Sequence, residues 1–139
     1  MPTVENLKFK ITDRKNKWVE VVGVKKNNVE TVIIPSSITT GGKEYKVTSI
    51  GDEVFWCYRS LTSITIPSSV TSIGEDAFRV CNSLTEIKVD SGNPVYDSRD
   101  NCNAIIETKS NTLIQGCAST IIPSSVTSIG YGAFAMRSS

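Results

Sequence analysis

A nine-residue segment that occurs twice without change constrains the fold of this 139-residue chain more than any other feature. Residues 66–74 and 122–130 both read Ile-Pro-Ser-Ser-Val-Thr-Ser-Ile-Gly, and a third copy between residues 34 and 51 is split by an insertion. The glycine of the motif recurs at Gly51 and Gly74. This spacing gives a period of about 23 residues, a length that indicates small supersecondary units stacked on one another around a shared core.

Each unit predicts one short strand followed by a turn. Residues 63–66 alternate between polar and apolar side chains, which is typical of a strand with one buried face, and the proline that follows ends the strand. Gly74 is expected to permit either a positive φ or close packing where the chain turns. A helical or 3₁₀ turn is expected from Glu75 to Val80. The predicted core includes Ile64, Ile66, Ile73, Phe78, Leu84 and Ile87.

Strands of successive units are expected to lie parallel in one sheet, with their outward side chains forming a ladder. The ladder is predicted to run through Thr31 and Ile33, Ser63 and Thr65, Glu86 and Lys88, and finally Ser119 and Ile121. Thr65 and Lys88 are expected to be exposed. Because this face is the regular exposed surface of the sheet, the candidate ligand-binding residues are Ser63, Thr65, Glu86 and Lys88.

The chain length suits a single domain, and the pattern divides it into four parts. We expect an N-terminal β cap over residues 1–31, repeats over 32–89, an insertion over 90–119, and a last, incomplete repeat over 120–139. The cap is predicted to be a β-meander with strands over residues 7–11, 18–24 and 29–34, which covers the end of the stack. The glycine pair at residues 41 and 42 is interpreted as a hairpin tip.

The insertion is predicted to contain a hairpin with strands over residues 104–106 and 112–114. Cys102 and Cys117 flank this hairpin, so they are either two buried thiols or a disulfide pair. The oxygen-rich segment 97–101 could bind Ca²⁺, but it lacks the spacing of an EF-hand loop and is interpreted as a turn.

The unit Leu61-x-x-Ile64-x-Ile66-Pro67-x-x-Val70-x-x-Ile73-Gly74-x-x-Ala77-Phe78-x-x-Cys81 closely resembles the BspA-like leucine-rich repeat. Residues from about 32 to 134 fit the repeat, and residues 90–121 resemble the insertion that many members carry. The resemblance implies a mainly β, right-handed leucine-rich-repeat solenoid with short parallel strands. It also implies a place on the surface of host-associated bacteria, where members bind host matrix proteins or other cells, and it supplies no catalytic residues.

The residue types do not predict an enzyme. Histidine is absent, which excludes Ser-His and Cys-His nucleophile pairs. The acidic pairs Asp52/Glu53 and Glu75/Asp76 are better interpreted as turn and helix-start residues than as an acid–base site. The four cysteines have no CxxC spacing, so neither a structural metal nor a cofactor is expected.

A net charge of +1 predicts no strong attraction to nucleic acid, and no apolar run is long enough to cross a membrane. The resemblance and the ladder geometry imply binding of an extracellular host or bacterial protein or glycan, with a purely structural spacer as the alternative. No signal peptide opens the sequence, so the protein is either intracellular or a surface or secreted protein without its targeting segment. The resemblance favours the second possibility.

The C-terminal end is expected to expose apolar side chains. Ile122, Val126, Ile129 and Phe134 belong to the last repeat, and no polar capping repeat follows them. Either a further repeat has been cut away from a longer chain, or a second copy covers the patch in a homodimer.

Overall fold

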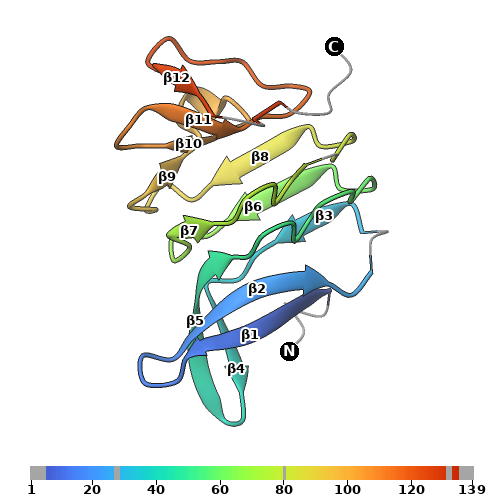
Figure 1. Cartoon of the computed structure of the whole chain (residues 1–139), viewed down its shortest axis with the longest axis vertical. Coiled ribbons are helices and arrows are strands. Elements are labelled where there is room, and N and C mark those ends of the chain that lie inside the picture. The colour runs from blue at the N-terminus through green and yellow to red at the C-terminus, as the bar shows by residue number, and fades with distance from the viewer. Residues whose placement is uncertain (1–5, 27–28, 80, 131–132, 135–139) are drawn as a thin grey trace.

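The computed structural model describes residues 6–26, 29–79, 81–130 and 133–134. Within these ranges the regular elements are β-strands and one short 3₁₀ helix, Arg99–Asn101. Along the long axis of the molecule, the β1–β2 and β4–β5 hairpins lie at one end, β3, β6 and β8 follow, and β9 to β12 lie at the other end (Figure 1). The expectation of a mainly β fold is confirmed.

A three-stranded parallel sheet carries the repeated strands. β3 (Thr31–Ile33), β6 (Ser63–Ile66) and β8 (Glu86–Val89) lie in the order β3-β6-β8. Ile64 of β6 pairs with Ile87 of β8, one period later, and with Val32 of β3, more than one period earlier. The spacing to β3 is longer because a hairpin intervenes between β3 and β6.

A second sheet forms the N-terminal end and one side of the stack. It contains β1 (Leu7–Asp13), β2 (Trp18–Val24), β4 (Ser37–Thr40), β5 (Lys43–Ile50) and β7 (Ser72–Ile73). β1 and β2 form the predicted antiparallel hairpin, and β4 and β5 form another whose tip holds Gly41 and Gly42, both with positive φ. β2 and β7 each pair with β5 in parallel.

The predicted three-stranded meander is wrong in its third strand. β3 does not pair with β2, because β5 takes that place and β3 joins the repeat sheet. The register explains this arrangement: Val19 and Val21 of β2 lie opposite Val47 and Ile50 of β5, and all four side chains are buried. A three-residue strand such as β3 offers less apolar surface than the eight-residue β5.

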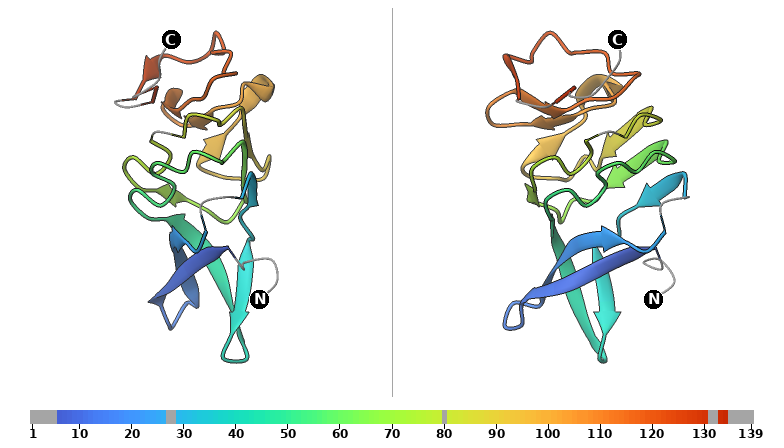
Figure 2. Two further views of the ribbon diagram at one scale, coloured as in Figure 1. Left: turned by 90° about the vertical axis from the view of Figure 1, so that its right-hand side faces the viewer. Right: turned by 45° about the vertical axis from the view of Figure 1, so that its right-hand side comes forward.

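The insertion and the last repeat form a third sheet, in the order β12-β11-β10-β9. Its strands are β9 (Tyr96–Asp97), β10 (Ile105–Glu107), β11 (Thr112–Gln115) and β12 (Ser128–Ile129). The predicted hairpin is confirmed as the antiparallel pair β10–β11, and β12 adds to β11 in parallel. Figure 2 shows this sheet above β8, at the C-terminal end of the stack.

The fourth rung predicted for the ladder is wrong. Residues 119–121 form no strand, and Ile121 is 78% exposed. The insertion occupies the free edge of β8 instead, because the Ser98 Oγ accepts a hydrogen bond from the Val89 N–H at 3.0 Å and the Asn103 Oδ1 accepts one from the Ile87 N–H at 3.3 Å. These side chains satisfy backbone donors that a further parallel strand would have bound.

Most of the predicted core is confirmed. Five of the six residues are buried, namely Ile64, Ile66, Phe78, Leu84 and Ile87. Ile73 is only half-buried, since it lies on the two-residue strand β7 at the margin of its sheet. The rings of Phe55 and Phe78, one period apart, are stacked with centroids 5.1 Å apart. A smaller core of Cys102, Ala104, Ile106, Leu113 and Ala133 lies under the insertion.

For the segment after the repeated glycine, predicted as a helical or 3₁₀ turn, the structure shows an isolated turn with an i→i+3 hydrogen bond and no helix. Asp76 has a φ of 53°, which interrupts a right-handed helix, and the Arg79 N–H donates to the Asp76 carbonyl at 3.2 Å in a simple turn. Val80 lies outside the described residues. Gly74 is required for close packing, because a β-carbon there would overlap the backbone of Gly51 and Asp52.

Candidate binding surface

The outward side chains of β3, β6 and β8 form two rows across the parallel sheet. The register aligns Thr31, Ser63 and Glu86 in one row and Ile33, Thr65 and Lys88 in the other. Neighbouring strands in a sheet lie about 4.8 Å apart, so each row spans about 10 Å. We call these six residues the sheet face, and it contains all four residues predicted to bind a ligand.

Three of the four predicted residues form one polar group. The Ser63 hydroxyl donates to Glu86 Oε1 at 2.7 Å, and Lys88 Nζ lies 3.4 Å from Glu86 Oε2. The hydrogen bond from Ser63, and then the charge of Lys88, lower the pKa of Glu86. Lys88 is exposed as predicted, whereas Thr65 is half-buried, because it lies between Ile33 and Lys88 on the flanking strands.

Two further features extend this surface: exposed Ile33, which belongs to the predicted ladder, and an asparagine shelf, which reasoning from the sequence missed. Ile33 is 65% exposed at the β3 end of the sheet face. At the opposite end, the side chains of Asn101 and Asn103 form a shelf beside Glu86 and Lys88, and the hollow between them has a volume of about 510 Å³. Both asparagines have positive φ, a conformation that asparagine adopts more readily than most residues. This preference was the one available signal for the shelf.

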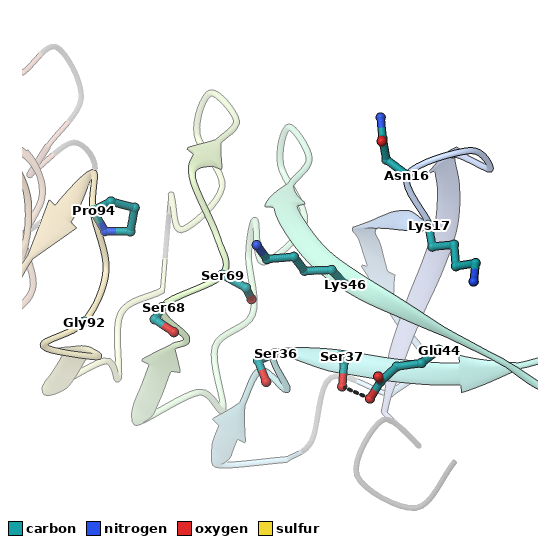
Figure 3. Close-up of a pocket in the computed structure, with 10 residues that line it drawn as sticks. All are labelled: Asn16, Lys17, Ser36, Ser37, Glu44, Lys46, Ser68, Ser69, Gly92 and Pro94. Carbon is teal, nitrogen blue, oxygen red and sulfur yellow. Dashed lines mark hydrogen bonds between the residues drawn. The ribbon is translucent and has the colours of Figure 1, made fainter.

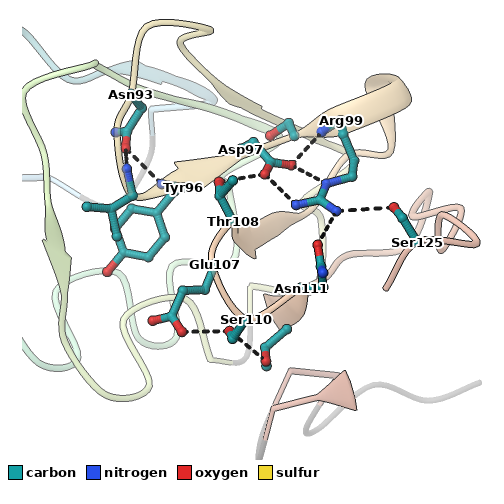
Figure 4. Close-up of polar contacts among 12 residues, drawn as sticks. Asn93, Tyr96, Asp97, Arg99, Glu107, Thr108, Ser110, Asn111 and Ser125 are labelled. Atoms are coloured by element: carbon teal, nitrogen blue, oxygen red, sulfur yellow. Dashed lines mark hydrogen bonds and ion pairs between the residues drawn. The ribbon is translucent and has the colours of Figure 1, made fainter. Parts of the chain in front are cut away.

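A polar network fixes the insertion that carries this shelf (Figure 4). Arg99 donates to both carboxylate oxygens of Asp97, at 2.8 and 2.7 Å, and its remaining terminal nitrogen donates to Asn111 Oδ1 at 2.7 Å and to Ser125 Oγ at 3.1 Å. The guanidinium group therefore joins β9, the tip of the β10–β11 hairpin and the last repeat. Thr108 donates a further hydrogen bond of 2.6 Å to Asp97.

The Asp97 carboxylate is committed to this network. Burial by itself would raise the pKa of Asp97, but the hydrogen bonds from Arg99 and Thr108 and the charge of Arg99 together lower it. The interpretation of residues 97–101 as a structural turn, rather than a Ca²⁺ loop, agrees with a cationic group at this carboxylate. Among the described residues, no three His, Cys, Asp or Glu side chains are grouped so that they could hold a metal ion.

The acidic pairs of the repeat turns serve backbone and surface contacts. Asp52 Oδ1 accepts a hydrogen bond of 2.8 Å from the Glu75 N–H of the next unit, and Asp76 lies 3.4 Å from Arg79. They are turn residues as predicted, but they do not begin a helix. Within the described ranges, none of the helices has the length and apolar character that a membrane crossing requires.

The four cysteines are free thiols. Cys102 and Cys117 are both buried, so the buried-thiol interpretation holds and the disulfide alternative does not. Cys81 is buried in a repeat position, where its thiol donates to the Phe55 carbonyl at 3.0 Å, and burial raises its pKa to about 12. Cys57 is the half-buried member of the set.

The C-terminal end exposes apolar side chains, as predicted. Ile122 and Ile129 are exposed, and Val126 and Phe134 are half-buried. Phe134 packs over Gly116, where a β-carbon would overlap its ring. Residues 135–139 of the predicted last repeat lie outside the described residues.

Residues 25–139 match a family model described as the BspA type leucine-rich repeat region, in six copies. A comparison with curated proteins finds no match. The matched range includes β3, β6 and β8, and therefore the whole sheet face.

Several solved bacterial structures are similar to this chain. A leucine-rich cell surface protein from Faecalibacterium prausnitzii A2-165 is 33% identical with a TM-score of 0.56, and the alignment covers 64% of this chain and 23% of that protein. A leucine-rich repeat protein from Bacteroides ovatus ATCC 8483 is 34% identical with a TM-score of 0.57 over the same shares. The chain thus spans about a quarter of the length of these relatives.

A leucine-rich repeat protein of T. pallidum shares the fold over 93% of this chain and 64% of its own length, with a TM-score of 0.60 and 23% identity. This alignment includes the N-terminal hairpins as well as the repeats, so the mainly β leucine-rich-repeat fold extends over nearly the whole chain.

Proposed function

Because this chain belongs to the BspA-type leucine-rich repeat family, we propose that it is a non-enzymatic binding module of a bacterial cell-surface or secreted protein. Its proposed partner is an extracellular protein, of the host or of another bacterium, that contacts the sheet face. The observation that carries this proposal is the flat array formed by β3, β6 and β8, with Ile33 exposed at one end and the Glu86–Lys88 pair at the other.

The composition of the sheet face favours a protein partner. An exposed aliphatic side chain on the same face as paired charges offers both apolar contact and charge complementarity, which protein interfaces combine. Within the Glu86–Lys88 pair, the hydrogen bond from Ser63 orients the Glu86 carboxylate before a partner arrives. Little ordering is then needed on binding.

The dimensions of the sheet face indicate modest affinity. Stable protein interfaces bury about 800 Å² on each partner, which is several times the area of a two-by-three array of side chains. A partner must therefore extend beyond the array, and the asparagine shelf next to Glu86 and Lys88 is the adjoining surface. Repetition of such surfaces along a longer surface protein would raise the overall affinity by multivalency.

The sequence spacing between paired strands supports a solenoid architecture. Paired residues of β6 and β8 are one period apart in the sequence, as are the stacked rings of Phe55 and Phe78. We infer a right-handed solenoid whose repeat of about 23 residues lies within the range of leucine-rich repeats. The β4–β5 hairpin and the insertion interrupt this solenoid. The name of the F. prausnitzii relative, a cell surface protein, supports the same location for this chain.

An exchange of the two charges on β8 tests the proposal. The double variant Glu86→Lys with Lys88→Glu keeps an ion pair within the strand but reverses the pattern presented to a partner. The immobilised chain is exposed to serum or solubilised host matrix, and each retained protein is then titrated against the wild-type chain and the variant. We expect the exchange to weaken binding at least tenfold.

A matched control is available in the insertion, where Glu107 and Lys109 are exchanged in the same way. Binding that survives the β8 exchange but is lost in this control would move the site to the insertion. No saturable binding by the wild-type chain would contradict the proposal and favour the spacer alternative.

A further inference from the structure

A second polar hollow, separate from the sheet face, lies where the chain leaves β3 and β6 (Figure 3). It has a volume of about 800 Å³, within the range of small-molecule sites, and its lining is hydroxyl-rich. Ser36 and Ser68 lie on its floor, and they are related by the same offset in the sequence as the paired residues Val32 and Ile64 of β3 and β6. The Pro-Ser-Ser segment of the repeated motif thus places equivalent hydroxyls side by side in consecutive layers.

Two lysines line this serine hollow, but the Lys17 side chain points away from the serines (Figure 3). Lys17 follows the β1–β2 turn and Lys46 lies on β5, and the Lys46 N–H donates to the Lys17 carbonyl at 2.7 Å. Figure 3 shows the Lys46 side chain extending toward Ser69. Neither lysine forms an ion pair with any described residue, whereas the nearby Glu44 accepts a hydrogen bond of 3.1 Å from Ser37. Lys46 therefore places a positive charge beside Ser69, while the negative charge of Glu44 lies beside Ser37.

Ser69 also lines the hollow, and its buried hydroxyl is a further polar group that a ligand could bind. It is only 8% exposed, yet its hydroxyl has no hydrogen-bond partner among the described residues. A buried hydroxyl without a partner is unfavourable, and most buried polar groups in proteins are satisfied. A ligand hydroxyl or carboxylate in the hollow would supply the missing partner after a change of the serine rotamer.

We propose that the serine hollow binds an acidic oligosaccharide. Lys46 pairs with a carboxylate or sulfate group of the sugar, and the hydroxyls of Ser36, Ser68 and Ser69 bind the ring hydroxyls. A neutral sugar would leave the Lys46 charge without a partner, and an apolar ligand would leave the serines unsatisfied. The site uses none of the charged residues of the sheet face, so the loss of one binding activity does not imply the loss of the other.

Trp18 provides a fluorescence signal for this test. It is exposed on β2 and lies opposite Lys46 in the parallel β2–β5 register, so a ligand on Lys46 changes its surroundings. The variant Trp56→Phe removes the other tryptophan of the chain and makes Trp18 the sole reporter. In this background, the chain is titrated with a heparin tetrasaccharide, a hyaluronan tetrasaccharide and the neutral cellotetraose.

We expect saturable binding of at least one acidic tetrasaccharide and at least tenfold weaker binding of cellotetraose. Lys46→Gln and Ser69→Ala should each lower the affinity for the acidic ligand at least fivefold. Lys88→Gln on the sheet face should change that affinity less than twofold. Circular dichroism melts check that each variant is folded. A comparison of the affinities for the heparin and hyaluronan tetrasaccharides shows whether the site prefers sulfate or carboxylate groups.

The proposal is overturned if neither acidic ligand binds, if cellotetraose binds as tightly, or if either Lys46→Gln or Ser69→Ala leaves the affinity unchanged. Equal weakening by Lys88→Gln would also overturn it, because it would indicate diffuse attraction to surface lysines rather than a site.

Discussion

Replacing Phe78 with alanine removes the side chain that stacks the repeat turns on one another. Phe78 is 2% exposed, and its ring lies parallel to that of Phe55 with centroids 5.1 Å apart. A buried aromatic side chain hides about 150–250 Å² of surface, which corresponds to about 4–6 kcal/mol at ~25 cal/mol per Å². Alanine retains part of that burial, and a cavity remains beside Phe55. We therefore expect a loss of about 3–5 kcal/mol in the free energy of unfolding.

Urea denaturation followed by far-ultraviolet circular dichroism measures this loss. Single domains are stable by about 5–15 kcal/mol, so a loss of about 3–5 kcal/mol should lower the transition midpoint by about a fifth or more. Ile121→Ala is the matched control, since Ile121 is 78% exposed and its truncation should change stability by less than about 0.5 kcal/mol. A loss under about 1 kcal/mol for Phe78→Ala would refute the assignment of this position to the core.

Four further predictions concern other parts of the chain. Gly74→Ala should lower the free energy of unfolding by more than about 2 kcal/mol in urea melts, because the added β-carbon would overlap backbone. In Gly23→Ala the β-carbon meets only a lysine side chain, so the free energy of unfolding should change by less than about 0.5 kcal/mol. Asp97 has a folded pKa below its ordinary 3.8, so its contribution to stability is present above that value and is lost as the pH falls through the folded pKa. Asp97→Asn should therefore flatten the decline of stability between pH 5 and pH 2, and parallel profiles would contradict this. A thiol reagent should modify Cys57 alone in the folded chain, since the other three cysteines are buried. Rapid modification of more than one cysteine per chain would contradict this prediction. We expect the exposed C-terminal end to associate with a second copy of the chain, so Ile129→Ser should reduce dimer formation in sedimentation velocity. A wild-type chain that stays monomeric at millimolar concentration would exclude this association.

The repeat register was predictable from the sequence because the repeated motif encodes it locally. Alternation in residues 63–66, the proline that ends the strand and the constant offset between units together place Ile64 opposite Ile87 and align Glu86 with Ser63. The residues of the sheet face could therefore be named before the structure. Their contacts with one another followed from the same register.

The pairing of β2 with β5 was not predictable in the same way, because it joins segments that share no motif. Strand patterns show which side chains are buried, but not which of several available partners covers them. The edge of β8 illustrates the same limit. Ser98 and Asn103 take the place of a fourth strand, and nothing in a polar loop sequence indicates which backbone donors its side chains will satisfy.

The serine hollow required the structure for a similar reason. Its serines come from the repeated motif, but Lys46 comes from the hairpin that splits the first copy. Only the fold brings these segments to one place. The unpartnered hydroxyl of Ser69 is likewise a property of packing, because the same serine in an open turn would bind water.

Hydrogen exchange of the chain with and without a captured extracellular protein tests whether the sheet face is the binding surface. We expect binding to slow exchange in β6 and β8, at residues 63–66 and 86–89, with little change in the β10–β11 hairpin at residues 105–115. Slower exchange confined to residues 105–115, or to the β1–β2 hairpin, with none in β6 and β8, would contradict the assignment of the sheet face as the binding surface.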